Sequence, residues 1–123
     1  PLIRLSDIQS LLDQTGPQGA ILALPVVDTI KQAAEQKHIA ATLDRAHIWR
    51  ALTPQLFPAQ ALLAALQGDL ATITDEASAM EREGRRPALV AGHSDNIKVT
   101  VPEDLALARF YLACQLGDEE SML

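Results

Sequence analysis

The chain is poor in aromatic residues, in cysteine and in basic side chains. Aromatic residues make up only 3% of its 123 residues, so the core must be built from Leu, Ile, Val and Ala. The single cysteine, Cys114, excludes an internal disulfide, and a reducing cytoplasm is the expected location. Because Cys114 lies in an apolar helical stretch, we expect it to pack rather than to act as a nucleophile.

The formal net charge of −6 limits the classes of partner. A general nucleic-acid binder or a protein of anionic membrane surfaces normally presents a basic face, so we expect neither nucleic acid nor membrane as a partner. No apolar run approaches the length of a membrane span, and no signal segment opens the sequence. The length suits one domain with a core of its own.

Helix and strand patterns alternate along the sequence, which indicates an α/β fold. The expected helices are residues 6–14, 58–70, 72–83 and a last helix that starts at the capping pattern 100–103. The expected strands are residues 20–24, 87–91 and 97–100. Residues 51–55 lead the chain back to the main body. The unbroken apolar run at 20–24 is typical of a strand buried on both faces of a parallel sheet. Three or four strands are too few for a complete doubly wound sheet.

Several details of these helices are expected as well. The first helix should open with a capping box at residues 6–9. The last helix is apolar almost all round, so it should be well buried, and an acidic, frayed tail should follow at 117–123. The second should bury one stripe of leucines, formed by Leu62, Leu63, Leu66 and Leu70. The sequence opens at Pro1, without Met, directly in helix-start chemistry, so we expect a piece of a longer chain.

Residues 26–50 differ from the rest, since they are polar and carry few large apolar side chains. Two β-tolerant pieces, 28–31 and 39–43, flank residues 32–38, and a short helix around 32–36 is an alternative for the middle. We interpret the segment as a hairpin-like excursion. Because it is too polar to form its own core, it should need a partner, often a second copy of the chain.

Residues 94–105 are the most informative stretch. Lys98, one of three lysines, stands between the apolar β-formers Ile97 and Val99, so on a strand it would point to the opposite face. Ligands usually sit at strand ends in α/β sheets, although a solvated lysine on an edge strand is the plainer alternative. Further candidate anion contacts are Thr29, Arg45, Thr53 and Thr74, and for Arg45 a solvated face is the alternative.

Other chemistries find little support in the sequence. The three histidines are scattered, which makes a zinc site improbable, and there is neither a nucleophile elbow nor a phosphate-cradling glycine loop. Acidic residues could assist a magnesium ion, although helix capping is the simpler role for two of them, Asp75 and Glu76. The acids considered for magnesium are Asp28, Asp44, Asp75, Glu76 and Asp95.

Five motifs occur in the order and spacing of one enzyme family. They are Leu24-Pro25-Val26-Val27-Asp28-Thr29-Ile30-Lys31 followed by Asp44-Arg45, Leu52-Thr53-Pro54-Gln55-Leu56-Phe57, Ala71-Thr72-Ile73-Thr74-Asp75-Glu76-Ala77-Ser78, Ser94-Asp95-Asn96-Ile97-Lys98-Val99-Thr100 and Pro102-Glu103-Asp104-Leu105. Over nearly all of its length the chain resembles the C-terminal half of the 2-C-methyl-D-erythritol 4-phosphate cytidylyltransferases. Residues 1–123 would then be the C-terminal part of a single cytidylyltransferase domain.

The resemblance implies a Rossmann-like nucleotidyltransferase sheet and a homodimer held by a β-arm, here residues 26–50. It implies the transfer of a cytidylyl group from CTP to methylerythritol phosphate, with Mg²⁺ held mainly by the upstream half. Lys98 would lie at the reacting phosphates and Asp95 at the methylerythritol phosphate. Thr29 and Arg45 would reach that substrate from the partner's arm, and Thr53 and Thr74 would line the same region.

The sequence also departs from the family. The glycine-rich loop, the cytosine-reading residues, the metal-binding aspartate and an Asp-Ala-Ala-Arg motif would all lie upstream of Pro1, so we expect this chain alone not to bind CTP productively. Ala91-Gly92-His93 replaces the usual Glu-Gly-Arg, which puts the local packing of that arginine in doubt. Two alternatives are a related ribitol-phosphate cytidylyltransferase and a non-catalytic dimerisation module.

Overall fold

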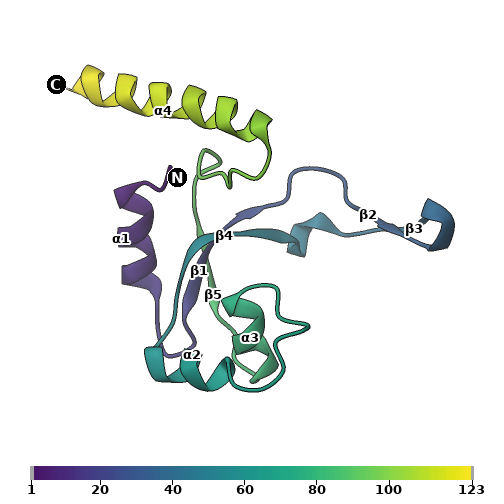
Figure 1. The fold of residues 1–123 in the computed structure, drawn as a ribbon. Coiled ribbons are helices and arrows are strands. Elements are labelled where there is room, and N and C mark those ends of the chain that lie inside the picture. Colours follow the sequence, from purple (N-terminus) through teal and green to yellow (C-terminus); the bar gives the residue numbers. More distant parts are fainter. Residues whose placement is uncertain (1, 123) are drawn as a thin grey trace.

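The computed structural model describes the chain from residue 2 to residue 122, and its side chains as far as residue 117. Helices and strands are interspersed along the chain, as expected for an α/β fold, although they do not alternate strictly (Figure 1). The elements are α1 (Leu5–Gln14), β1 (Ala20–Pro25), β2 (Lys31–Ala33), β3 (Ile39–Thr42), β4 (Trp49–Leu56), α2 (Ala59–Ala65), α3 (Glu76–Arg82), β5 (Ala88–Ala91) and α4 (Pro102–Met122), with single 3₁₀ turns at Glu35–Lys37 and Arg45–His47.

A three-stranded sheet in the order β4-β1-β5 forms the centre of the molecule. β1 pairs in parallel with β5 and antiparallel with β4, so the expectation of a parallel sheet holds for one neighbour only. The apolar run of β1 is buried on both faces, as its sequence indicates. Along β4 the register shifts opposite Leu22, where the peptide bond between Thr53 and Pro54 is cis.

The two faces of β1 pack against different helices. Leu22 and Val90 meet Leu11 of α1 on one face, whereas Ile21 and Ala23 meet α3 on the other. α2 then covers α3 through a small cluster around the fully buried Met80. These aliphatic contacts make a narrow core, in agreement with the scarcity of aromatic residues.

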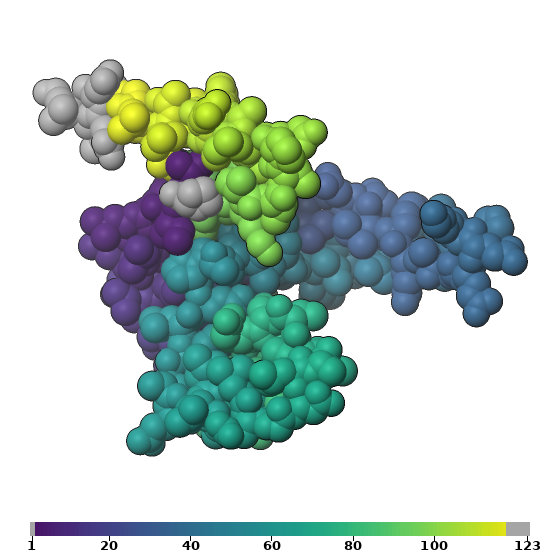
Figure 2. All heavy atoms as spheres, in the orientation of Figure 1, coloured from purple at the N-terminus to yellow at the C-terminus, as the bar shows by residue number. Residues whose placement is uncertain are grey.

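The polar excursion forms a separate two-stranded hairpin of β2 and β3, whose strand residues are all exposed. It stands out from the body as a projection in Figure 2. Its first strand lies at Lys31–Ala33 rather than at 28–31, which is a correction in detail. The short helix considered for residues 32–36 is absent as such, since 31–33 are strand and a 3₁₀ turn follows at Glu35–Lys37.

Three expectations for the helices are wrong, and one is confirmed. α1 has Arg4 at its N-cap with no side-chain cap, so Ser6, the expected N-cap residue, lies inside the helix and the capping box does not form. α2 ends at Ala65 rather than 70, and Leu63 and Leu70 are exposed rather than part of the buried stripe. The cap and the two acids expected at the start of α3 are confirmed, since Asp75 is its N-cap, Glu76 its first residue, and Asp75 and Ser78 form a reciprocal capping box.

Residues 97–100 form no strand, so the strand expected there is absent.

The last helix, α4, is less buried than its composition suggests. The partly or fully buried positions of α4 are Asp104, Ala108, Tyr111 and Gln115, which form one stripe. The apolar side chains on its other sides are exposed, Phe110 and Cys114 among them, so the packing role expected for Cys114 is also wrong. The helix continues through 117–122, the expected frayed tail, whose side chains from 118 onward lie outside the described residues.

None of the helices described by the structure is long and apolar enough to cross a membrane.

Candidate active site

A cavity of about 750 Å³ lies between β4, the start of α3 and the segment that follows β5. It is lined by Ala51, Leu52, Thr53, Gln55, Thr74, Asp75, Glu76, Asn96, Ile97, Lys98 and Val99. Three of the predicted site residues, Thr53, Thr74 and Lys98, are therefore brought together. Because residues 96–99 follow the carboxyl end of β5, the cavity lies where α/β sheets usually bind ligands.

Gln55 joins two walls of this cavity. Its Oε1 accepts a hydrogen bond from the Ala77 backbone N–H at 3.1 Å, and its Nε2 donates to Asp75 Oδ2 at 3.0 Å. The other oxygen of Asp75 accepts from Ser78 N at 2.8 Å as the helix cap. The amide of Gln55 thereby holds the start of α3, and with it Thr74, against β4. Sequence reasoning gave Gln55 no role, since a polar residue on a strand carries no signal of a distant partner.

Asn96 was likewise missed as a site residue. It is buried, and its Nδ2 donates to the backbone carbonyl of Thr53 at 2.6 Å. This bond ties the segment carrying Lys98 to the strand carrying Thr53. As the single asparagine of the chain, beside a lysine in a turn motif, Asn96 could have been singled out from the sequence.

Asp95 does not line the cavity. The carboxylate of Asp95 is buried outside the cavity and faces Arg4, whose Nε and Nη2 donate to its two oxygens at 3.3 and 2.5 Å. Gln115 of α4 donates to the same carboxylate at 3.1 Å. The hydrogen bond from Arg4 lowers the pKa of Asp95, with smaller contributions from Gln115 and the charges of Arg4 and His93, while burial acts in the opposite direction.

This lowered pKa predicts a loss of stability in acid. A carboxyl group whose pKa is lower in the folded than in the unfolded chain stabilises the fold above its ordinary value near 3.8, and that stabilisation disappears as the pH falls through the folded pKa. Thermal unfolding of wild type and Asp95→Asn should therefore differ most near pH 6, and the difference should shrink as the pH falls below the ordinary value near 3.8. The exposed Asp13→Asn controls for loss of one charge. A difference that stays constant down to pH 3 would contradict the assignment.

His93 occupies the position where the family usually has arginine. Its Nδ1 lies 2.7 Å from Oδ1 of Asp7, whose side chain is almost fully buried. In this chain, the contact joins the segment after β5 to the buried carboxylate of α1.

Thr29 and Arg45 lie away from this cavity, in the hairpin segment. Arg45 Nη1 donates to the carbonyl of Val27 at 2.5 Å and so closes the base of the hairpin. Within one copy of the chain, the structure does not bring these two residues to Thr53, Thr74 and Lys98.

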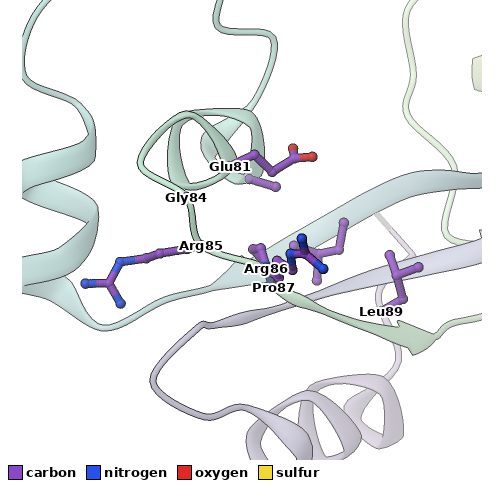
Figure 3. Close-up of a pocket in the computed structure, with 8 residues that line it drawn as sticks. Glu81, Gly84, Arg85, Arg86, Pro87 and Leu89 are labelled. Atoms are coloured by element: carbon purple, nitrogen blue, oxygen red, sulfur yellow. The ribbon is translucent and has the colours of Figure 1, made fainter.

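A second cavity, of about 510 Å³, lies at the opposite end of β5 (Figure 3). Glu81 of α3 and the segment Gly84 to Leu89 form much of its lining, and the guanidinium of Arg85 points away from β5, toward the carbonyl of Pro17. None of the predicted site residues lies there. Since ligands favour the carboxyl ends of the strands, the larger cavity is the candidate site.

The described residues do not fit a metal centre. Across residues 2–117, no three His, Cys, Asp or Glu side chains are grouped so that they could hold a metal ion. The catalytic steps considered for residues 2–117 therefore involve no metal.

The family model of the 2-C-methyl-D-erythritol 4-phosphate cytidylyltransferases (IspD) matches residues 1–114 of the chain. The chain belongs to this family. Its resemblance in sequence motifs is thus supported over almost the whole length, including the segment that carries Lys98.

Two curated cytidylyltransferases show how close the relationship is. A 2-C-methyl-D-erythritol 4-phosphate cytidylyltransferase from Tolumonas auensis is 54% identical over 120 residues, which are 94% of this chain and 53% of the relative. One from Haemophilus influenzae is 56% identical over 115 residues, 91% of this chain and 51% of the relative. The chain spans about half the length of the curated relatives it matches.

Solved cytidylyltransferase structures show the same fold. A crystal structure of 4-diphosphocytidyl-2C-methyl-D-erythritol synthase matches with a TM-score of 0.77 at 44% identity, over 90% of this chain and 50% of that chain. The Francisella tularensis cytidylyltransferase matches with a TM-score of 0.78 at 35% identity, over 88% and 53%. The fold expected from the resemblance is confirmed for the part described here.

Proposed function

We propose that this chain forms part of a 2-C-methyl-D-erythritol 4-phosphate cytidylyltransferase, which joins CTP to methylerythritol phosphate and releases pyrophosphate. The observation that carries the proposal is the family match along residues 1–114, which includes the three predicted residues gathered at one cavity: Thr53, Thr74 and Lys98. The activity would require the half of the relatives that this chain does not span, and this chain would contribute substrate contacts and the cation of Lys98.

The chemistry suits these residues. An oxygen of the methylerythritol phosphate attacks the α-phosphorus of CTP, a new P–O bond forms, and the bond to the leaving pyrophosphate breaks. Negative charge must be gathered and then stabilised on the phosphoryl oxygens, which makes fixed cations and hydrogen-bond donors the main requirement. Lys98 supplies the cation, and the hydroxyl groups of Thr53 and Thr74 can donate to phosphate oxygens.

The hairpin is proposed as a dimerisation arm. Its strand residues are exposed and it has no core, and Thr29 and Arg45 lie in it rather than at the cavity of their own chain. In a homodimer the arm of one copy would bring Thr29 and Arg45 to the methylerythritol phosphate of the other. The guanidinium suits a phosphate group, because it presents several donors in one plane.

The test uses a fused enzyme, in which the amino-terminal half of the Tolumonas auensis relative is joined in front of Pro1. We expect pyrophosphate release that requires both CTP and methylerythritol phosphate, and none from the 123-residue chain alone. Activity of the chain alone would contradict the proposed division of roles. A folded fused enzyme that is inactive, or that prefers ribitol phosphate, would contradict the proposed function.

Removal of the arginine of the arm should separate the two substrates. In the fused enzyme, Arg45→Ala should raise the KM for methylerythritol phosphate by about 10- to 100-fold, since a hydrogen bond to a charged group contributes about 1.5–3 kcal/mol. The KM for CTP should change far less. Lys31→Ala, which removes another cation of the same hairpin, is the control. Equal effects of Arg45→Ala on both substrates, in a variant that remains a dimer, would remove Arg45 from this role.

A further inference from the structure

We propose that Arg4 is a positioning residue for the cavity: it fixes the turn at residues 93–96 through Asp95 and thereby sets Asn96 and Lys98 against β4. Its expected effect on turnover rests on the proposed function, whereas its effect on the conformation of the turn does not. Arg4 lies at the start of α1 and does not line the cavity, so it acts through other residues.

The segment that carries Lys98 has no regular support of its own. Residues 97–100 belong to no strand, so no ladder of backbone hydrogen bonds holds them to the sheet. Two local bonds shape the preceding turn, from Asn96 N to His93 O at 3.1 Å and from Ile97 N to Asp95 O at 2.9 Å. These bonds lie within the turn and do not attach it to the body.

Side chains make that attachment instead. Arg4 and Gln115 hold Asp95, Asp7 holds His93, and Asn96 holds the carbonyl of Thr53. Arg4 and Asp7 belong to the amino-terminal segment, and His93 and Asp95 belong to the turn after β5. Arg4 forms an ion pair with Asp95, and His93, when it is protonated, forms one with Asp7. In Figure 2 the amino-terminal residues lie directly against α4, which carries Gln115.

The pair between Arg4 and Asp95 has most control over the turn. Asp95 is only 6% exposed, and a buried carboxylate without a cationic partner is strongly disfavoured. With Arg4 removed, the neutral amide of Gln115 and the more remote His93 would replace a direct ion pair only in part, and the turn would have to move until water reached the carboxylate. Asn96 is the next residue, so that movement would break its 2.6 Å bond to Thr53 and displace Lys98.

The geometry favours arginine over lysine at this position. Two guanidinium nitrogens donate to two different oxygens of Asp95, a two-point contact that fixes orientation as well as distance. Lysine would keep the charge but would make a single point contact. Arg4→Met should therefore release the turn, and Arg4→Lys should restore part of its order.

The single asparagine of the chain provides a direct readout. With asparagine labelled by ¹⁵N at its side chain, the 123-residue chain gives one pair of amide signals, from the group that bonds to Thr53. In Arg4→Met we expect these signals to move to the position of free asparagine and their hydrogen exchange to accelerate at least about tenfold. Arg4→Lys should give an intermediate result. Arg85→Met, which removes an arginine at the other cavity, should leave the signals unchanged.

Circular dichroism should verify that each variant is folded. If Arg4→Met does not fold, Arg4→Lys carries the test, because it keeps the charge that the buried carboxylate needs. A folded Arg4→Met, or in its place a folded Arg4→Lys, whose Asn96 signals and exchange equal those of wild type would overturn the proposal.

Activity provides the second readout, in the fused enzyme. Displacement of a positioned cation by about 1 Å can cost about 100-fold in rate, so kcat should fall about 10- to 100-fold in Arg4→Met and recover in part in Arg4→Lys. An inactive wild-type fused enzyme combined with the expected Asn96 changes would contradict the proposed function and support the positioning role. An active enzyme in which Arg4→Met changes neither kcat nor the Asn96 signals would contradict the positioning role and leave the function intact.

Discussion

Replacement of Lys98 by alanine should lower kcat of the fused enzyme by about two to three orders of magnitude. A preorganised positive group aimed at developing charge contributes about 3–4 kcal/mol to stabilisation of a transition state. Lys98 lines the cavity and is exposed, so the thermal midpoint should change little. Steady-state kinetics with both substrates, together with thermal unfolding, measure the two quantities.

The control for this variant is Arg85→Ala, which removes a cation from the cavity at the other end of β5. It should retain normal turnover. A Lys98→Ala enzyme with normal kcat would remove Lys98 from the mechanism. A variant that loses activity and thermal stability together would show that its main role is structural.

Gly19→Ala should destabilise the fold by about 2–5 kcal/mol. Gly19 precedes β1 with a φ of +84°, a conformation that costs an L-residue about 1–2 kcal/mol. A Cβ there would also lie 2.1 Å from Cδ1 of Phe57 and 2.9 Å from the carbonyl oxygen of Leu56, so both must shift, and such overpacking costs about 1–3 kcal/mol. Chemical unfolding of the chain measures the sum.

Two other glycines separate the terms of this prediction. Gly68 has a similar φ of +89° but open space around it, so Gly68→Ala should show the backbone term alone. Gly16 has neither the positive φ nor a neighbour within 4 Å, so Gly16→Ala should be close to neutral or slightly stabilising. If Gly19→Ala lowered the free energy of unfolding no more than Gly68→Ala, Phe57 and Leu56 would relax without strain, and the predicted packing cost would be wrong.

Local patterns predicted those parts of the fold whose determinants are close in sequence. The apolar run at β1, the strand β5, and Asp75 as an acid at the start of α3 all follow from neighbouring residues. The hairpin was expected from polarity alone, although its first strand begins at Lys31. The family motifs then identified Thr53, Thr74 and Lys98, which the fold gathers at one cavity.

The failures arise where a distant residue decides the structure. Ser6 was expected to cap α1 but lies inside the helix, and the neighbouring Asp7 contacts His93, 86 positions away. Residues 97–100 have strand-forming side chains, yet no neighbouring strand is available to them in the described structure, and the turn before them is fixed by Arg4. The resemblance likewise suggested a substrate contact for Asp95, whereas its carboxylate faces Arg4; that contact remains a prediction without support from this geometry.

The pair of Arg4 and Asp95 has a consequence for the order of events during synthesis. The two residues are 91 positions apart, so at about 5–20 residues per second the ribosome completes Asp95 roughly 5–20 s after Arg4. During that interval α1 can form, but the turn that orients Lys98 has no counterpart, and Gln115 follows later still. The binding cavity is therefore a late product of translation, and a nascent chain interrupted before its last quarter holds the threonines of the cavity without the lysine that completes it.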